Sequence, residues 1–127
     1  MRIVNISLGH PVFESYADDP LAQAVQRVID DGVVVVASAG NYGKVKVDGE
    51  DVPVFGGIAS PGNLPDVITV GALNTKGSVN RYDDVVTTYS SRGPTAIERV
   101  GKPDLGAPGD EVGAARGAGS TGAQTAP

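Results

Sequence analysis

Residues 33–41 read VVVVASAGN and carry the strongest fold signal in the chain. Four consecutive valines leave no polar face, which is typical of a strand buried on both sides in a parallel sheet. The small residues that follow, ending in Gly40, allow another segment to approach closely, and Asn41 then brings a side-chain amide. The stretch therefore predicts a buried strand over residues 33–39 whose carboxyl end carries a polar group at a close-packed place.

The composition agrees with a small soluble α/β domain. The chain has 127 residues, of which 40% are hydrophobic and 20% charged. It has no Trp and two Phe, so its core must consist of aliphatic side chains. Its 18 Gly and 9 Pro predict long loops, and the absence of Cys excludes disulfides and thiolate metal sites.

The charge excludes some classes of partner. A net charge of −5 and a pI of about 4.6 give no basic footprint for nucleic acid, and the basic residues are scattered rather than clustered. No apolar run approaches membrane-spanning length. We expect neither nucleic acid nor a membrane as a partner.

A strand–helix–strand unit is predicted at the N-terminus. Residues 3–8 (IVNISL) favour a strand, and Asp18 or Asp19 can cap a helix with Pro20 in its first turn. An apolar face repeats at helical spacing up to Gly32, which supplies the stop. That face consists of Leu21, Val25, Val28 and Ile29. The order implies two parallel strands joined by a right-handed crossover.

The rest of the chain alternates strands and turns. Residues 44–54 predict a hairpin excursion around Asp48-Gly49, and residues 67–73 (VITVGAL) a buried strand. Residues 85–94 favour a strand that ends in a loop, and residues 102–112 a turn followed by a short strand. Residues 113–127 have almost no apolar mass, so we expect a flexible tail. About three parallel strands and one helix result, and one helix can cover only one face of the sheet.

Four segments of the chain resemble, in order and spacing, the later part of the catalytic domain of subtilisin-like serine proteases. They are NISLG at residues 5–9, GVVVVASAGN at 32–41, SPGNLPDVITVGA at 60–72, and YSSRGP followed by KPDLGAPG within 89–109. The resemblance implies a partial subtilisin-like three-layer α/β fold, with residues 1–127 forming one partial catalytic domain.

The resemblance implies a substrate groove. It makes Asn41 an oxyanion-hole donor and places Ala39 and Gly40 in one wall of the pocket for the side chain before the cut. The opposite wall, which pairs with an extended peptide substrate as an added strand, would consist of Ser7, Leu8 and Gly9. The resemblance also implies a cis bond between Ser60 and Pro61.

Some relatives bind a weak cation close to this groove. The resemblance carries the oxygen ligands over to the carbonyls of Gly62, Leu64 and Val67 and the carboxylate of Asp104. Such a set suits Ca²⁺ or a monovalent cation. No cofactor is otherwise required.

The family's Asp, His and Ser triad motifs are not found in this sequence. The one histidine, His10, follows the wall at residues 7–9 and is expected to be a loop residue. Ser120 and Thr121 only faintly resemble the nucleophile motif, with Thr125 at the proline position. We therefore expect a fragment of a serine endopeptidase that is inactive alone.

Two alternatives stay open beside the inactive fragment. The chain can be a non-catalytic module of subtilase origin that binds peptides or itself, or a hydrolase that uses Ser7 or Ser120 with His10. The strand at residues 3–8 would form an open edge, so a homo-oligomer is expected. The family is usually secreted, yet the N-terminus MRIVNISLGH enters a strand pattern at once and predicts no secretory signal. The compartment stays open.

Overall fold

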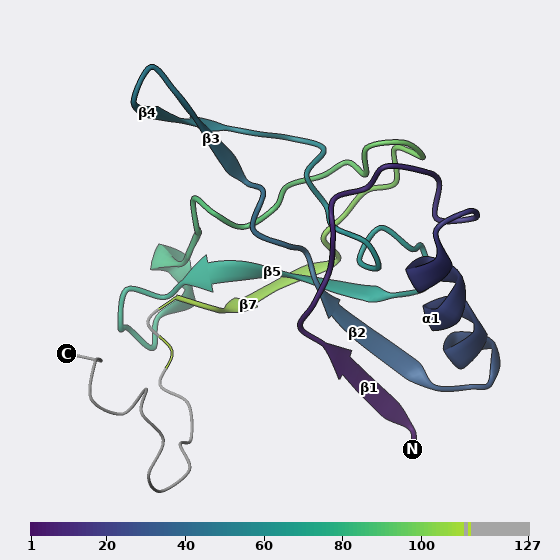
Figure 1. Cartoon of the computed structure of the whole chain (residues 1–127). Coiled ribbons are helices and arrows are strands. Elements are labelled where there is room, and N and C mark those ends of the chain that lie inside the picture. Colours follow the sequence, from purple (N-terminus) through teal and green to yellow (C-terminus); the bar gives the residue numbers. More distant parts are fainter. Residues whose placement is uncertain (111, 113–127) are drawn as a thin grey trace, which may run out of the picture.

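This computed structural model describes residues 1–110 and 112. The fold is built around one mixed sheet (Figure 1). Its parallel strands lie in the spatial order β1 (Ile3–Ile6), β2 (Val34–Ser38), β5 (Ile68–Asn74) and β7 (Leu105–Pro108). The short strand β6 (Val85–Val86) pairs antiparallel with the end of β5. The α/β fold with a short parallel sheet is confirmed, and β7 extends it beyond the three strands expected.

The helix α1 (Pro20–Asp30) begins and ends where the sequence predicts. Asp19 is its N-cap, with a carboxylate oxygen 2.9 Å from the amide nitrogen of Leu21, and Pro20 occupies the first helical position. Gly32 follows the helix with a φ of +84°, which a residue with a Cβ adopts only with strain.

The core lies between α1 and one face of the sheet. Ala22 and Val25 of α1 pack with Val35 and Ala37, which alternate along β2, and with Leu64 and Val67 from the loop before β5. On the other face, Ile3 is 65% exposed, Val34 46% and Ile68 38%. None of the described helices covers that second face.

The long connections carry a hairpin and a tight loop. The strands β3 (Lys44–Val47) and β4 (Glu50–Pro53) pair antiparallel around Asp48 and Gly49, both with positive φ, and extend away from the sheet (Figure 1). A 3₁₀ turn, η1 (Arg81–Asp83), precedes β6. The bond between Ser60 and Pro61 is cis, as the resemblance implied. The predicted tail at residues 113–127, with Ser120, Thr121 and Thr125, lies outside the described residues.

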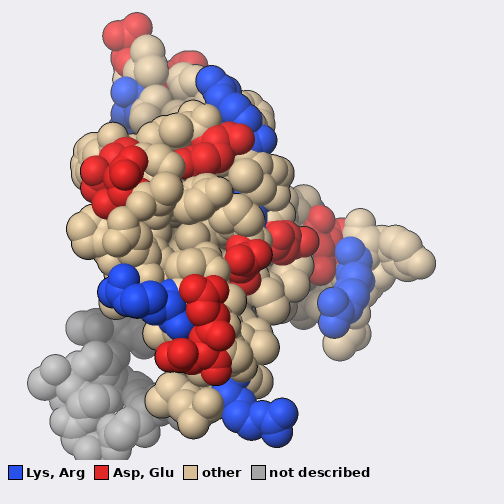
Figure 2. All heavy atoms as spheres, turned by 90° about the vertical axis from the view of Figure 1, so that its right-hand side faces the viewer, with Lys and Arg blue, Asp and Glu red and all other residues tan. Residues whose placement is uncertain are grey.

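Charges are mixed over the surface that carries α1. Figure 2 shows acidic side chains along the middle of that side and basic side chains scattered towards its edges. Among the residues that the structure covers, no helix has the length and apolar character needed to cross a membrane.

Candidate functional site

Two predicted walls face each other across a cavity at the carboxyl ends of β1 and β2. Residues 7–9 follow β1, and residues 39–41 follow β2. The cavity has a volume of about 460 Å³ and is lined by Ser7, Leu8, Gly9, Ser38, Gly40, Asn41, Tyr42 and Ala59. Ligands of open parallel sheets commonly bind beyond the carboxyl ends of the strands, so this is the best-placed hollow for a ligand.

Ala39 supports this cavity from behind. The residue is 1% exposed, and its amide nitrogen lies 2.9 Å from the carbonyl oxygen of Val70 in β5. Its own carbonyl accepts a hydrogen bond of 2.9 Å from the amide of Ala59. Ala39 is therefore a fixed part of the wall rather than a surface that a ligand touches.

Backbone bonds on both sides hold Asn41 in place. The amide of Ser91 donates to the carbonyl of Gly40 at 2.9 Å, and the Ser91 hydroxyl accepts from the amide of Tyr42 at 3.0 Å. Gly40 has a φ of +100°, and a Cβ on it would lie 2.9 Å from the Cβ of Ala59. The segment around Asn41 is thus tightly packed, while the Asn41 side chain itself is exposed.

Asn41 also borders a second, larger cavity. This hollow of about 610 Å³ lies over the uncovered face of the sheet and shares Ser7, Ser38 and Asn41 with the first one. Asn41 therefore lines both hollows.

The facing wall is attached to the loop that contains the cis bond. His10 and Ser60 exchange two backbone hydrogen bonds of 3.1 and 3.0 Å. A Cβ on Gly9 would lie 2.5 Å from the carbonyl oxygen of Ser60, so no larger residue fits there without movement. Leu8, between Ser7 and Gly9, is 59% exposed and projects where a ligand can reach it.

The sequence profile described as the Subtilase family matches residues 1–126. The chain belongs to the subtilase family. It is 39% identical over 112 residues to serine protease AprX of Bacillus subtilis (strain 168), a match that covers 87% of this chain and 23% of AprX. It is 31% identical over 110 residues to the membrane-bound transcription factor site-1 protease of Mus musculus, covering 83% of this chain and 9% of that protease.

Solved subtilase-like structures share its fold. The S41 psychrophilic protease matches with a TM-score of 0.61 and 31% identity, over 84% of this chain and 31% of that protein. Sphericase matches with a TM-score of 0.60 and 31% identity over the same shares of the two chains. This subtilase chain thus spans less than a quarter of the two curated relatives above and about a third of these solved structures.

Ser60, Asp19 and His10 form a polar cluster beside the first cavity of this subtilase chain, with Ser60 and Asp19 buried and the His10 side chain 40% exposed. Asp19, 3% exposed, accepts a short hydrogen bond from the hydroxyl of Ser60, and its carboxylate lies 3.4 Å from Nε2 of His10. Burial alone would raise the pKa of Asp19, but hydrogen bonds from Ser60 and Leu21 and attraction to His10 hold that pKa below its ordinary value. Sequence reasoning missed this cluster because Asp19 and Ser60 are 41 positions apart.

That cluster has the wrong order for nucleophilic catalysis. In a serine-protease triad the histidine lies between the serine and the aspartate and takes the serine proton. Here the Asp19 carboxylate lies between Ser60 and His10, and the other ring nitrogen of His10 faces the carbonyl of Pro11 at 2.8 Å. The cluster can stabilise the fold, but it has no geometry for activating a hydroxyl.

The four predicted cation ligands already have hydrogen-bond partners in the chain. The carbonyl of Val67 and the carboxylate of Asp104 accept from the ammonium of Lys102, at 2.6 and 2.7 Å. The carbonyl of Gly62 accepts from the Thr69 hydroxyl at 2.6 Å, and that of Leu64 from the Val67 amide at 3.4 Å. Within residues 1–110 and 112, no group of three or more His, Cys, Asp or Glu side chains could hold a metal ion.

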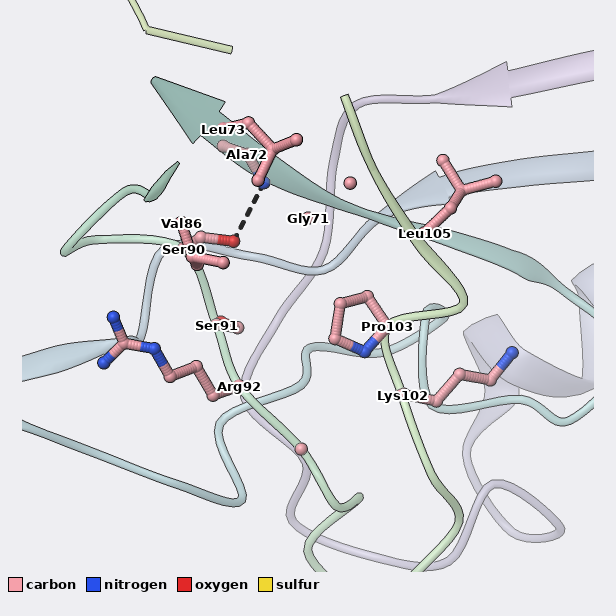
Figure 3. A pocket seen from close by; sticks show the side chains of 12 residues that line it. Gly71, Ala72, Leu73, Val86, Ser90, Ser91, Arg92, Lys102, Pro103 and Leu105 are labelled. Carbon is pink, nitrogen blue, oxygen red and sulfur yellow. Dashed lines mark hydrogen bonds between the residues drawn. The ribbon is translucent and has the colours of Figure 1, made fainter. Parts of the chain in front are cut away.

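A further hollow lies between β5, β7 and the segment at residues 90–93 (Figure 3). It has a volume of about 430 Å³, and its walls are largely apolar, including Leu73, Val86, Pro103 and Leu105. The Ser90 hydroxyl at its edge accepts from the amide of Ala72 at 3.0 Å. The described residues that line this hollow include no Asp, Glu or His.

Proposed function

We propose that this chain is the substrate-groove part of the catalytic domain of a subtilisin-like serine endopeptidase, with Asn41 as a donor of the oxyanion hole. The strongest support for this proposal is the arrangement of the two walls. In a chain of the subtilase family, the walls at residues 7–9 and 40–41 face each other across one cavity at the carboxyl ends of β1 and β2.

The groove suits an extended peptide. An incoming strand can pair with the backbone of residues 7–9, which continues from the edge strand β1. The small residues Gly40 and Ala59 leave room between the walls for the side chain that precedes the scissile bond. Leu8 supplies an exposed apolar contact beside that chain.

Asn41 then acts on the carbonyl of the scissile bond. As that carbon becomes tetrahedral its oxygen gains negative charge, and a pre-placed N–H donor stabilises the charge without having to reorganise. The bonds from Ser91 to Gly40 and Tyr42 support this role, because they hold the backbone on both sides of Asn41. In subtilisin, loss of the corresponding asparagine lowers kcat by about 10²–10³. We expect a loss of this size for Asn41 when the groove is part of an active catalytic domain.

We propose that the chain alone does not cleave peptides. The ring of its only histidine, His10, interacts with Asp19 and Pro11 and makes no hydrogen bond to a hydroxyl group in the described part of the chain. The test incubates the purified chain with chromogenic peptides and a serine-directed phosphonate, with AprX as a positive control. We expect no leaving group and no label; stoichiometric labelling of a serine would refute this part of the proposal.

Peptide binding tests the groove itself. In a ¹⁵N-labelled chain, an extended peptide should shift the amide signals of residues 7–9 and 40–42. The matched control is the same peptide with alternate backbone nitrogens methylated, which cannot form the strand hydrogen bonds. We expect the control to bind at least about tenfold more weakly, the loss of one or two hydrogen bonds. Equal binding of both peptides, or shifts confined to other residues, would contradict the groove.

A second candidate function is self-association. On the uncovered face, Ile3 of β1 lies beside Val34 of β2 in the sheet register, and both are about half exposed or more. β1 is also the first strand of the described sheet, so its outer edge can pair with another chain. Light scattering should find a dimer or larger species that Ile3→Lys dissociates, while Val79→Lys, at a fully exposed loop position, leaves it intact. A folded monomer of the unmutated chain would remove this candidate.

A further inference from the structure

Lys102 is a buried lysine with an oxygen cage around its ammonium. Its side chain is 1% exposed. Nζ lies 2.6 Å from the carbonyl oxygen of Val67, 2.7 Å from a carboxylate oxygen of Asp104 and 3.3 Å from the carbonyl oxygen of Pro65. The other lysines lie on exposed or half-exposed surface; the side chain of Lys46, for example, is 73% exposed and forms a surface ion pair with Asp51.

This cage compensates the cost of burying a charge. An ammonium has three N–H donors, and three oxygen atoms of the cage accept them. Without such partners a buried ammonium would lose most of its hydration and give up its proton. The negative charge of Asp104 and the two carbonyl dipoles favour a cation at this position whatever its identity.

The same oxygens have the chemistry of a metal site. Carbonyl and carboxylate oxygens are the ligands that Ca²⁺ and alkali ions prefer. Val67 and Asp104 belong to the predicted cation ligands, yet Nζ of Lys102 already lies within hydrogen-bond distance of both. A metal ion would meet this ammonium at contact distance. The donor set present therefore does not fit a metal ion.

We propose that Lys102 is an internal cation, carried by the chain itself, that takes the place of an ion in this cage and holds the loop at residues 61–67. The ammonium joins that loop to Asp104, which precedes β7. Asp104 in turn accepts from the Thr69 amide at 2.7 Å and donates its own amide to the Thr69 carbonyl at 2.9 Å.

The cage is separate from the apolar hollow next to it. In Figure 3 the Lys102 side chain points away from the other side chains of that hollow, whereas the ring of Pro103 borders it. The Pro103 ring packs so closely on Gly71 of β5 that a Cβ there would lie 3.1 Å from it. Successive residues thus serve two purposes: Pro103 fixes the backbone on the sheet, and Lys102 supplies the cation to the loop. The assignment does not depend on any catalytic role of the chain.

Substitution of Lys102 should make the fold depend on an added cation. Lys102→Ala leaves the oxygen cage and a space, and we expect its unfolding midpoint to fall by about 10 °C. Ammonium, methylammonium or potassium chloride should restore part of that loss saturably, whereas choline chloride at equal ionic strength should not, because choline is too large. Lys102→Met fills the space without a charge, so it should be destabilised and gain nothing from these salts.

Controls separate a specific cation from general screening. Lys46→Ala, at a side chain 73% exposed, should leave the midpoint and its salt response unchanged. The unmutated chain should show no saturable gain from K⁺ or Ca²⁺. Equal rescue of Lys102→Ala by choline, or a saturable gain of the unmutated chain that a chelator reverses, would overturn the proposal.

A measurement on the unmutated chain covers the case in which Lys102→Ala does not fold. Under limited reductive methylation, Lys102 should react at least about tenfold more slowly than Lys44, Lys46 and Lys76, since its amine becomes accessible only by local opening. Comparable rates at all these lysines would overturn the proposal without any substitution.

Discussion

The hydroxyl of Ser60 donates a hydrogen bond to the carboxylate of Asp19, and this bond joins the helix cap to the groove. Asp19 begins α1, while Ser60 exchanges backbone bonds with His10 directly after the wall at residues 7–9. One buried carboxylate thus serves the helix, the loop and the wall. Changes at Asp19 should therefore affect groove geometry as well as helix stability.

Substitutions of Asp19 separate its cap from its charge. Asp19→Asn keeps a good N-cap but loses the charged acceptor for Ser60, whereas Asp19→Ala loses both. We expect Asp19→Ala to lower the free energy of unfolding by about 2 kcal/mol or more, and Asp19→Asn by less. Urea denaturation of both variants measures this. Asp18→Ala, the exposed neighbour, is the matched control, and a loss equal to that of Asp19→Ala would contradict the assigned cap.

The free energy of unfolding should fall at acid pH because the carboxylates of Asp19 and Asp104 become protonated. The pKa of Asp19 lies below its ordinary value for the reasons given above, and that of Asp104 lies below it because Lys102 and the Thr69 amide outweigh the opposing effect of burial. Each folded carboxyl therefore takes up its proton at lower pH than the unfolded one, whose pKa is 3.8. The stabilisation is present above that pH and is lost as the pH falls through the folded pKa values.

Unfolding free energies measured from pH 7 down to pH 2.5 test this directly. The unmutated chain should lose stability steeply below about pH 4. Asp19→Asn and Asp104→Asn should each be less stable at neutral pH and show a shallower acid slope. Parallel pH profiles in all three proteins would show that other groups carry the acid response.

Two glycines of the groove should not tolerate a methyl group. A Cβ on Gly9 would meet the Ser60 carbonyl oxygen at 2.5 Å, and Gly40 combines a φ of +100° with a contact of 2.9 Å. Alanine at either position should destabilise the fold by about 1–3 kcal/mol. Gly101→Ala is the control, since nothing lies within 4 Å of its added Cβ. Thermal unfolding of the three variants measures this loss of stability. A Gly9→Ala variant as stable as the unmutated chain would mean that the wall at residues 7–9 can move to accept the methyl group.

Much of this architecture is readable from local patterns in the sequence. The helix has its cap and its proline at adjacent positions and a glycine directly after its last turn, at Gly32, and β2 is marked by consecutive valines. The two walls were predicted from the resemblance to subtilases and not from a local pattern. A short strand was predicted within residues 102–112, but not its place in the sheet, because Leu105–Pro108 contains a glycine and a proline and shows no alternation. Its place depends on pairing with β5.

Long-range polar contacts were beyond sequence reasoning. Lysine is normally exposed, and nothing in the neighbourhood of Lys102 in sequence, apart from Asp104, indicates that its amine reaches the carbonyls of Pro65 and Val67. Asp18 or Asp19 was predicted as the helix cap, but the bond of Asp19 to Ser60 depends on how the loop that contains Ser60 packs on α1. In both cases the tertiary fold selects the partner, and the residue types alone do not.

Substitution of Ser91 tests how the backbone around Asn41 is held in place. Its amide bonds to Gly40 through the backbone, and its hydroxyl accepts from Tyr42 through the side chain. Ser91→Ala removes the second bond alone and leaves the Tyr42 amide without its acceptor. Hydrogen exchange at the Tyr42 amide should therefore accelerate by about tenfold or more, while the Ser91 amide keeps its protection.

The effect of Ser91→Ala on peptide binding shows whether Ser91 positions Asn41 or only stabilises the fold. If Ser91 positions Asn41, peptide binding in the groove should weaken by more than the change in unfolding free energy explains, and Asn41→Ala added to Ser91→Ala should cost little more. Ser78→Ala, at an exposed loop hydroxyl, is the control and should leave exchange and binding unchanged. Unchanged exchange at Tyr42 in Ser91→Ala would mean that the segment around Asn41 is held by Gly40 and Ala39 alone.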